Sequence, residues 1–312
     1  MYSPTYKRTN LAIHFVNLPN KRKKMTTLKI FEFNSFGEHC YVAWDSNDCE
    51  SNSKLIASAQ CDNADNAARD NIAGHNQKKE CIIIDPGCYE PQEKDRLFTF
   101  LNDNLLTPAS VLLTHAHPDH CFGVATVCRK YGVPVYMNEN ENVTLSVMHK
   151  LCLGMGADDV EDFSEYTRYI EDGEVLDLGP FTVTALSTPG HSAGGTSYLV
   201  KERTNNKVDI KDCRHADDRQ HCIKEKTENQ ADAKDGSKSI LFSGDTLFAG
   251  CIGRSDLPGG DYDKLMESIF TKLLPLDGDT DVLPGHGHST TIADERMKNP
   301  FLLPFNEPEP GE

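Results

Sequence analysis

The sequence predicts an α/β fold, in which strands and helices alternate along the chain. Short apolar runs such as Ile82-Ile83-Ile84 have the length and composition of buried strands. A helical pattern separates that run from the next predicted strand, which gives a strand-helix-strand unit. Four of the predicted strands also end at a histidine or an aspartate, so polar groups are expected along one edge of the sheet system.

The first half of the chain begins with a predicted hairpin. Asn34-Ser35-Phe36-Gly37 has the composition of a turn between two strands, and Pro86-Gly87 closes a third strand. Leucine and phenylalanine recur near helical spacing between residues 97 and 105, which predicts a helix there. In order, the predicted elements are strands at 28–33, 40–44 and 81–85, a helix around 97–105, a strand at 110–114, a helix at 124–131, a strand at 133–137 and a helix at 142–153.

Shorter strands dominate the second half of the chain, and they carry the remaining polar strand ends. A helical pattern interrupts them near the C-terminal side. The predicted elements are strands at 174–178, 181–187 and 197–200, a strand at 240–244, a helix at 262–274 and a strand at 281–283. Three of these strands lead to His191, Asp245 and His286.

Three histidines and an aspartate are crowded into one segment directly after the predicted strand at 110–114. The segment reads His115-Ala116-His117-Pro118-Asp119-His120. Pro118 disfavours regular structure just beyond the strand, so we expect these side chains on a turn at the strand's carboxyl edge. A lone histidine is more often structural, but four ligand-type side chains at this spacing indicate a metal site.

The polar residues at the other strand ends extend this set to seven metal ligands. A catalytic zinc keeps a position open for water, so seven ligands suit two metals that share a carboxylate. Imidazole suits zinc or iron, and carboxylate favours manganese or iron. The sequence therefore predicts two divalent metal ions, zinc first with iron or manganese as alternatives. The predicted ligands are His115, His117, Asp119, His120, His191, Asp245 and His286.

Composition and charge favour a small-molecule substrate. The net charge of −16 over 312 residues disfavours nucleic acid and anionic membranes as partners. No stretch approaches the roughly 18 apolar residues of a membrane span. The 11 cysteines lack an extracellular disulfide spacing. We therefore expect a cytoplasmic protein with reduced thiols, and the sequence leaves its oligomeric state open.

Three segments are predicted to lie outside the packed core. Residues 1–24 end in a basic run before an ordinary domain start at Met25, which predicts a flexible extension before a domain of residues 25–312. Residues 45–80 lose periodicity, and about half of residues 202–238 are charged, which predicts two insertions. Each precedes a strand that ends in the site region, so both are expected to leave the sheets opposite the ligands.

At the ligand positions the chain resembles the metallo-β-lactamase superfamily, most closely its glyoxalase II-like hydrolases without a separate helical domain. The matching motifs run from about residue 25 to residue 305, outside the insertions. The resemblance implies a four-layer αββα sandwich with the metal site at one edge between two sheets. It also implies that Asp85 supports the ligand loops rather than binding metal. The implied ligands are His115, His117 and His191 for one metal, Asp119, His120 and His286 for the other, and Asp245 for both.

This resemblance implies a metal-dependent hydrolase of the hydroxyacylglutathione hydrolase type. A hydroxide that bridges two metal ions is a nucleophile near neutral pH, because metal binding lowers the pKa of water to about 7. Asp119 would help to orient the hydroxide, which makes it the predicted catalytic residue, and no serine or cysteine nucleophile is needed. A thiolate is a good leaving group, so the predicted substrate is a small-molecule 2-hydroxyacyl thioester.

Three other functions are alternatives to a thioesterase. A persulfide dioxygenase would bind one iron through His115, His191 and Asp245, but Pro258 resembles the hydrolases where the dioxygenases usually have glutamine. A lactamase-like or lactonase-like hydrolase is the second alternative, although Asp245 disfavours the branch with cysteine in the second metal site. A binding or scaffold protein without activity is the third.

Two residues are candidates for substrate contact. Arg254 can bind a substrate carboxylate bidentately, with an ion pair to Asp256 as the structural alternative. His39 lies in a loop that is expected to approach the site. Only 26 residues follow His286, too few for the helical domain that holds glutathione in full-length glyoxalase II enzymes. The sequence therefore leaves the thiol open and predicts weak selectivity for it.

Overall fold

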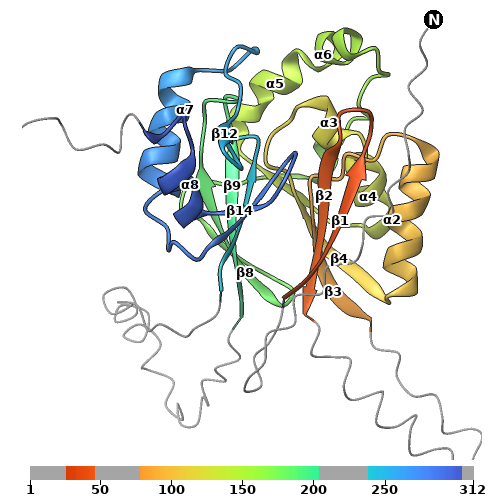
Figure 1. Cartoon of the computed structure of the whole chain (residues 1–312). Helices are drawn as coiled ribbons and strands as arrows, with labels where there is room; N and C mark the ends of the chain where they lie inside the picture. The colour runs from red at the N-terminus through yellow and green to blue at the C-terminus, as the bar shows by residue number, and fades with distance from the viewer. Residues whose placement is uncertain (1–25, 46–77, 204–237, 304–312) are drawn as a thin grey trace, which may run out of the picture.

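The structure, a computed structural model, describes residues 26–45, 78–203 and 238–303, which form two facing sheets (Figure 1). The first sheet has β1 (Thr26–Phe33), β2 (Glu38–Asp45), β3 (Lys79–Ile84), β4 (Leu106–Leu112), β5 (Val135–Met137) and β6 (Thr167–Tyr169), in this order. The second has β14 (Thr290–Thr291), β13 (Asp281–Pro284), β10 (Ile240–Gly244), β9 (Thr196–Glu202), β8 (Phe181–Ser187) and β7 (Val175–Leu178), in this order. A small hairpin pairs β11 (Leu247–Phe248) with β12 (Cys251–Ile252).

Helices cover the outer face of each sheet. In Figure 1, α2 and α4 lie outside the first sheet, α7 and α8 lie outside the second, and α5 and α6 cross the upper edge. The structure thus confirms the predicted αββα sandwich. The helices are α2 (Pro91–Asp103), α3 (Pro118–Cys121), α4 (Val124–Tyr131), α5 (Asn142–Ser146), α6 (Met148–Met155), α7 (Tyr262–Ser268) and α8 (Ile292–Lys298), with short turns η3 (Glu139–Glu141), η4 (Ser164–Tyr166) and the π-helical η5 (Ile269–Leu273).

The apolar strands are continuous because both faces of each sheet are covered. In β3, Ile82 and Ile84 face the second sheet, whereas Ile83 faces the outer helices. In β10, Phe242 faces the first sheet and Leu241 faces the helices on the opposite side. Three apolar layers therefore hold the sandwich together, one between the sheets and one under each helical layer.

Strand directions bring the polar strand ends to one edge. The strands β3, β4 and β5 run parallel, as do β10 and β13 in the second sheet. Parallel strands present their carboxyl ends at the same edge, which is where ligand sites form in such sheets. At the opposite edge lie Asp45, Lys79 and Glu202, which border the segments predicted as insertions.

Some predicted boundaries were wrong. The predicted helix to residue 105 ends at Asp103, because Leu105 has a positive φ of 54° that starts the turn into β4. The predicted helix at 142–153 is two helices, α5 and α6, separated at Val147. Pro118 starts the short helix α3, since proline is tolerated in a first helical turn. The short elements β6, β14 and α8 had not been predicted.

The predicted insertions are also shorter than expected at their ends. Residue 45 belongs to β2, residues 79 and 80 belong to β3, and residue 202 belongs to β9. Most of both insertions and the predicted extension at 1–24 lie outside the described residues. Among the described residues, no helix combines the length and the hydropathy that crossing a membrane requires.

Candidate metal centre

All seven predicted ligands lie at the edge where the two sheets meet. The first sheet supplies the loop after β4 and the short helix α3, and the second sheet supplies the loops after β8, β10 and β13. Six of the seven side chains are buried or nearly so, and His286 is about a quarter exposed. The structure thus brings together His115, His117, Asp119, His120, His191, Asp245 and His286.

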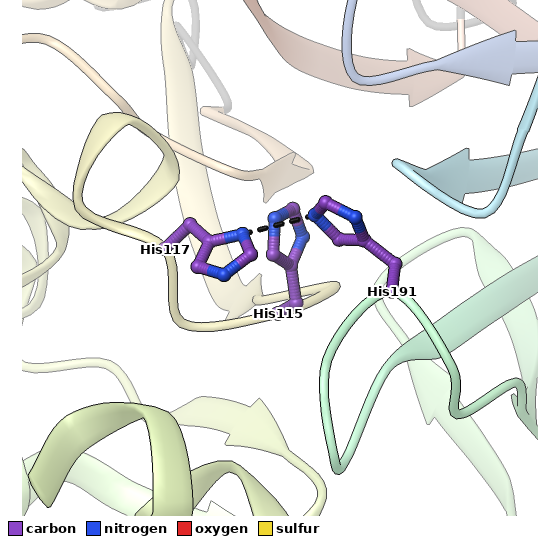
Figure 2. Close-up of side chains that lie close together, drawn as sticks. All are labelled: His115, His117 and His191. Atoms are coloured by element: carbon purple, nitrogen blue, oxygen red, sulfur yellow. Dashed lines mark hydrogen bonds between the residues drawn. The ribbon is translucent and has the colours of Figure 1, made fainter. Parts of the chain in front are cut away.

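Three of these histidines form the first cluster. The rings of His115, His117 and His191 point toward one another (Figure 2), and one nitrogen from each lies within 4.8 Å of the others. His191 Nε2 and His117 Nδ1 are 2.9 Å apart. Burial, followed by the neighbouring His191, lowers the pKa of His117 to about 3. Neutral imidazoles are therefore favoured here, as metal ligation requires.

The second cluster contains Asp119, His120 and His286, and Asp245 lies between the two clusters. His286 Nε2 is 3.4 Å from Asp119 Oδ2. Asp245 Oδ1 is 3.6 Å from His120 Nε2, while Asp245 Oδ2 is 3.6 Å from both His191 Nε2 and His286 Nε2. One carboxylate thus faces both clusters, which is the geometry that a shared ligand needs.

The second cluster differs from the first in charge. Burial opposes a charge on His120, but the carboxylates of Asp119, Asp245 and Asp85 outweigh it and raise the pKa of His120 to about 10. Burial also opposes a charge on His286, but Asp119 and Asp245 outweigh it and raise the pKa of His286. This half of the site therefore favours positive charge, as a site for a divalent cation does.

Acceptors on the far side of three imidazoles orient the near nitrogen toward the centre. His120 Nδ1 donates to Asp85 Oδ2 at 3.0 Å, and His191 Nδ1 donates to the Arg254 carbonyl at 2.7 Å. His286 Nδ1 donates to the Phe36 carbonyl at 3.2 Å. Because each far nitrogen donates a proton, Nε2 is the nitrogen of each ring that is left for a metal, which would displace the second proton favoured on His120 and His286.

The unsatisfied atoms at this edge fit metal ions. His115 Nε2, His117 Nε2, His120 Nε2 and Asp245 Oδ1 are buried and have no hydrogen-bond partner among the described residues. Leaving such atoms unpaired costs about 1–3 kcal/mol each. Divalent cations bound by imidazole and carboxylate would satisfy His115 Nε2, His120 Nε2 and Asp245 Oδ1, whereas His117 turns Nδ1 toward the first cluster, so the residues present fit the metals that the sequence predicts.

The structure places Asp85 behind the ligands rather than among them. Its carboxylate accepts hydrogen bonds from the Thr114 backbone N–H at 2.7 Å, from Thr114 Oγ1 at 2.6 Å and from His120 Nδ1. Thr114 Oγ1 in turn lies 3.0 Å from His115 Nδ1. Asp85 therefore orients two ligand rings at once, and its positive φ of 45° shows that the surrounding turn holds it in an uncommon conformation.

Sequence reasoning missed Glu141, which links the two loops of the first cluster. Glu141 is fully buried, and its carboxylate accepts from the Ala116 N–H at 2.7 Å, from Ser192 Oγ at 2.5 Å and from the Gly194 N–H at 2.7 Å. Ala116 lies between two ligands, and Ser192 follows His191 directly. Glu141 thus fixes the separation of the ligand loops. Its neighbours, Asn138 to Asn142, are all polar, so nothing local distinguished it from a surface residue.

Glu38 is a second buried carboxyl group that the sequence did not single out. It is fully buried at the start of β2, and its carboxyl group lies close to Gly87. Neither oxygen has a hydrogen-bond partner among the described residues. Burial, followed by the nearby Asp85 and Asp119 carboxylates, raises the pKa of Glu38 well above the usual 4.5. Burial and the neighbouring carboxylates therefore favour the protonated form of Glu38 in the folded protein.

The variant Glu38→Gln is expected to gain stability over the wild type as the pH rises. The folded protein keeps a proton that the unfolded chain releases, so wild-type stability falls by up to about 1.4 kcal/mol per pH unit between the unfolded and folded pKa values. Glutamine lacks this proton, so the advantage of the variant grows as the pH rises above the pKa of glutamate in the unfolded chain, about 4.3. Thermal unfolding of both metal-loaded proteins measures it, and parallel pH profiles would contradict a protonated Glu38.

A close backbone approach explains the glycine before the last ligand. A Cβ atom on Gly285 would lie 2.3 Å from Asp245 Oδ1 and 2.7 Å from His120 Cε1. Real Cβ atoms essentially never come this close to another heavy atom. A side chain at residue 285 would therefore displace the carboxylate that faces both clusters.

A cavity of about 390 Å³ opens beside the clusters. Its lining includes His117, Asp119, His191 and Asp245 at the metal end, so a bound molecule can reach the centre directly. The remaining lining comes from Phe36, Pro118, α6 residues, Arg254 and Leu257.

The two predicted substrate contacts have different positions. Arg254 lines the cavity, but its guanidinium donates twice to the Asp256 carboxylate, at 2.7 and 2.8 Å. This is the ion pair to Asp256 that the sequence offered as the alternative to substrate binding. His39 does not belong to the lining of this cavity. Its backbone N–H donates to the Gly285 carbonyl at 2.8 Å, so His39 holds the loop of the last ligand.

Comparisons with known proteins agree with this architecture. A sequence profile described as the metallo-beta-lactamase superfamily matches residues 75–202. The chain is 31% identical over 228 residues to the hydroxyacylglutathione hydrolase GloC of Haemophilus influenzae, a match that covers 73% of this chain and 89% of the relative. It is 35% identical over 227 residues to the probable metallo-hydrolase YqgX of Bacillus subtilis, with 73% and 89% covered.

Solved structures show the same fold. The crystal structure of the B3 metallo-beta-lactamase BLEG-1 superposes with a TM-score of 0.59 at 28% identity, covering 88% of this chain and 99% of the other. TTHA1623 in a di-iron-bound form gives a TM-score of 0.56 at 26% identity, covering 88% and 100%. The matched profile, the relatives at 31–35% identity and the ligand edge of the sandwich together show that this chain belongs to the metallo-β-lactamase superfamily and is a metal-dependent hydrolase.

Proposed function

We propose that the protein hydrolyses 2-hydroxyacyl thioesters with two divalent metal ions, as glyoxalase II-type enzymes do. The position of Asp245 carries this proposal, because its two oxygens lie 3.6 Å from nitrogens of both histidine clusters. A carboxylate in that position suits two metals rather than one. The similarity to GloC, named a hydroxyacylglutathione hydrolase, supports the reaction, and TTHA1623 with two irons supports the metal number.

The metals and the protein divide the chemistry. When bound, divalent cations supply a Lewis acid for the thioester carbonyl and lower the pKa of water to about 7. Asp119 lies at the cavity wall, with one oxygen 3.4 Å from His286 Nε2. From there Asp119 can accept a hydrogen bond from the attacking water and orient it. Zinc is our first choice of metal, with iron or manganese as alternatives.

A panel of substrates tests the proposal. We expect the metal-loaded enzyme to release free thiol from S-lactoylglutathione and related 2-hydroxyacyl thioesters, and Asp119→Asn to lower kcat by about 10²-fold or more. Thiol release with a chromogenic reagent measures both rates, and circular dichroism shows whether the variant stays folded. Asp95→Asn, an exposed aspartate on α2, is the control and should keep wild-type activity.

Other outcomes of the panel would favour the alternatives. A lactamase is the second candidate, because BLEG-1 shares 28% identity with the chain. Hydrolysis of a β-lactam without thioester hydrolysis would replace our proposal with that activity. Oxygen uptake with glutathione persulfide would instead indicate a dioxygenase. No turnover by protein with full metal content would indicate a binding or scaffold role.

The compartment is part of the same proposal. The seven described cysteines are free, and six of them are buried. Unpaired thiols suit a reducing compartment, so we place the enzyme and its small-molecule thioester in the cytoplasm.

A further inference from the structure

Helix α6 forms one wall of the cavity beside the metal centre. Met148 and Cys152 of α6 are buried, and the helix contacts α3, which carries two predicted ligands. The α6 residues that line the cavity are Lys150, Leu151, Gly154 and Met155. Residues three and four apart share one face of a helix, so these four residues form a continuous surface opposite the metal ligands.

The wall carries a positive charge that is available to a ligand. The lining contains two cationic side chains, Lys150 and Arg254. Arg254 is held by Asp256 through two hydrogen bonds of 2.7 and 2.8 Å. Within the described segments Lys150 forms no ion pair, and its side chain is exposed. An ammonium group offers three hydrogen-bond donors to an anion.

Gly154 keeps space open in the same wall. Glycine is among the poorest helix formers, yet Gly154 lies within α6 and is exposed. A Cβ atom there would meet no heavy atom within 4 Å, so packing does not require a glycine. Because Gly154 lines the cavity, a larger side chain would project into it.

We propose that α6 recognises the thiol part of the substrate, with Lys150 binding a carboxylate or phosphate of that thiol and Gly154 leaving room for it. This inference rests on the proposed thioesterase function. The acyl carbonyl lies at the metal end, and the thiol extends along the apolar side chains of Leu151 and Met155 toward the ammonium group. A carrier site on α6 would make the enzyme more selective for the thiol than the sequence predicted.

Substitution of Lys150 tests the charge. Lys150→Gln should lower kcat/KM about tenfold for thioesters of an anionic thiol, mainly by raising KM. The two thiols to compare are glutathione, which carries carboxylates, and coenzyme A, which carries phosphates. For thioesters of the neutral N-acetylcysteamine the loss of kcat/KM should stay under about twofold. Lys150→Arg, which keeps the positive charge, should retain most of the wild-type kcat/KM for the charged thioesters. Lys201→Gln is the matched control and should behave as wild type. Lys201 is an exposed lysine near the end of β9. If the glutathione thioester shows the larger loss, Lys150 binds a carboxylate; if the coenzyme A thioester does, Lys150 binds a phosphate.

Substitution of Gly154 tests the space. Gly154→Leu should raise KM for glutathione or coenzyme A thioesters about tenfold while leaving N-acetylcysteamine thioesters nearly unchanged. Gly154→Ala, which improves helix propensity, should keep the fold and most activity. Calorimetry of free glutathione and free coenzyme A binding to the wild type and Lys150→Gln gives a readout that does not depend on turnover.

The outcomes separate this inference from the proposed function. Equal losses for charged and neutral thioesters in Lys150→Gln would overturn the role of Lys150 while the thioesterase stands. Wild-type protein that hydrolyses no thioester would overturn the proposed function and this inference with it. Equal binding of both free thiols to wild type and Lys150→Gln would also overturn the anion site.

Discussion

Asp245→Ala is expected to lower the metal content from about two ions per chain to one or fewer and to abolish thioester hydrolysis. Asp245 Oδ1 faces His120 and Asp245 Oδ2 faces His191 and His286, each at 3.6 Å. Removing the carboxylate takes a ligand from both clusters at once. Loss of groups that only support metal ligands already costs 10–100-fold, so removing a shared ligand should cost well over about 10²-fold in activity.

The measurement is elemental analysis after gentle purification, together with the rate of thiol release. Asp95→Ala on the exposed surface of α2 controls for the loss of one aspartate and should keep both metals. Variants of His120 and His286 probe the second cluster alone. One iron per wild-type chain, with no loss of activity in the His120 and His286 variants, would contradict the binuclear centre and support the dioxygenase.

The ligands could be predicted from the sequence because their signal is local. Each of them follows a short apolar run, and parallel strands bring such ends to one edge, so residue type and position within a strand are enough. The supporting role of Asp85 came from the family resemblance, and its place in an Asp-Pro-Gly turn after a buried strand is visible in the sequence. The sandwich followed from the family resemblance, and the strands that are apolar on both faces agree with it.

The supporting residues could not be predicted because tertiary burial creates their roles. Glu38 sits beside Gly87, which is far along the chain, and its strand position alone does not show that its carboxyl group is enclosed. Helix α6 was predicted as part of a longer helix, but which of its faces meets the cavity depends on its packing against α3. Leu105 fitted the helical spacing, and only the positive φ before β4 excludes it from α2.

Glu141→Ala is expected to destabilise the protein by about 3–5 kcal/mol and to weaken metal binding. The substitution leaves three buried donors without an acceptor, and each such loss costs about 1–3 kcal/mol. Ala116 and Ser192 adjoin ligands of the first cluster, so the loop that carries His191 would no longer be tied to the loop after β4. Glu141→Gln should be intermediate, because its NH₂ group would face a donor at one of the three contacts.

Chemical denaturation measures the loss of stability, and competition with a chelator measures metal affinity. Glu139→Ala is the matched control, since Glu139 lies two residues away in the same polar stretch and is exposed, and it should change stability by less than about 0.5 kcal/mol. If Glu141→Ala behaved like Glu139→Ala, the three hydrogen bonds would not hold the ligand loops together. A large loss of metal affinity in Glu141→Gln, with stability only moderately lowered, would show that Glu141 acts on the metal centre through the positions of the His115-to-His117 loop and the His191 loop.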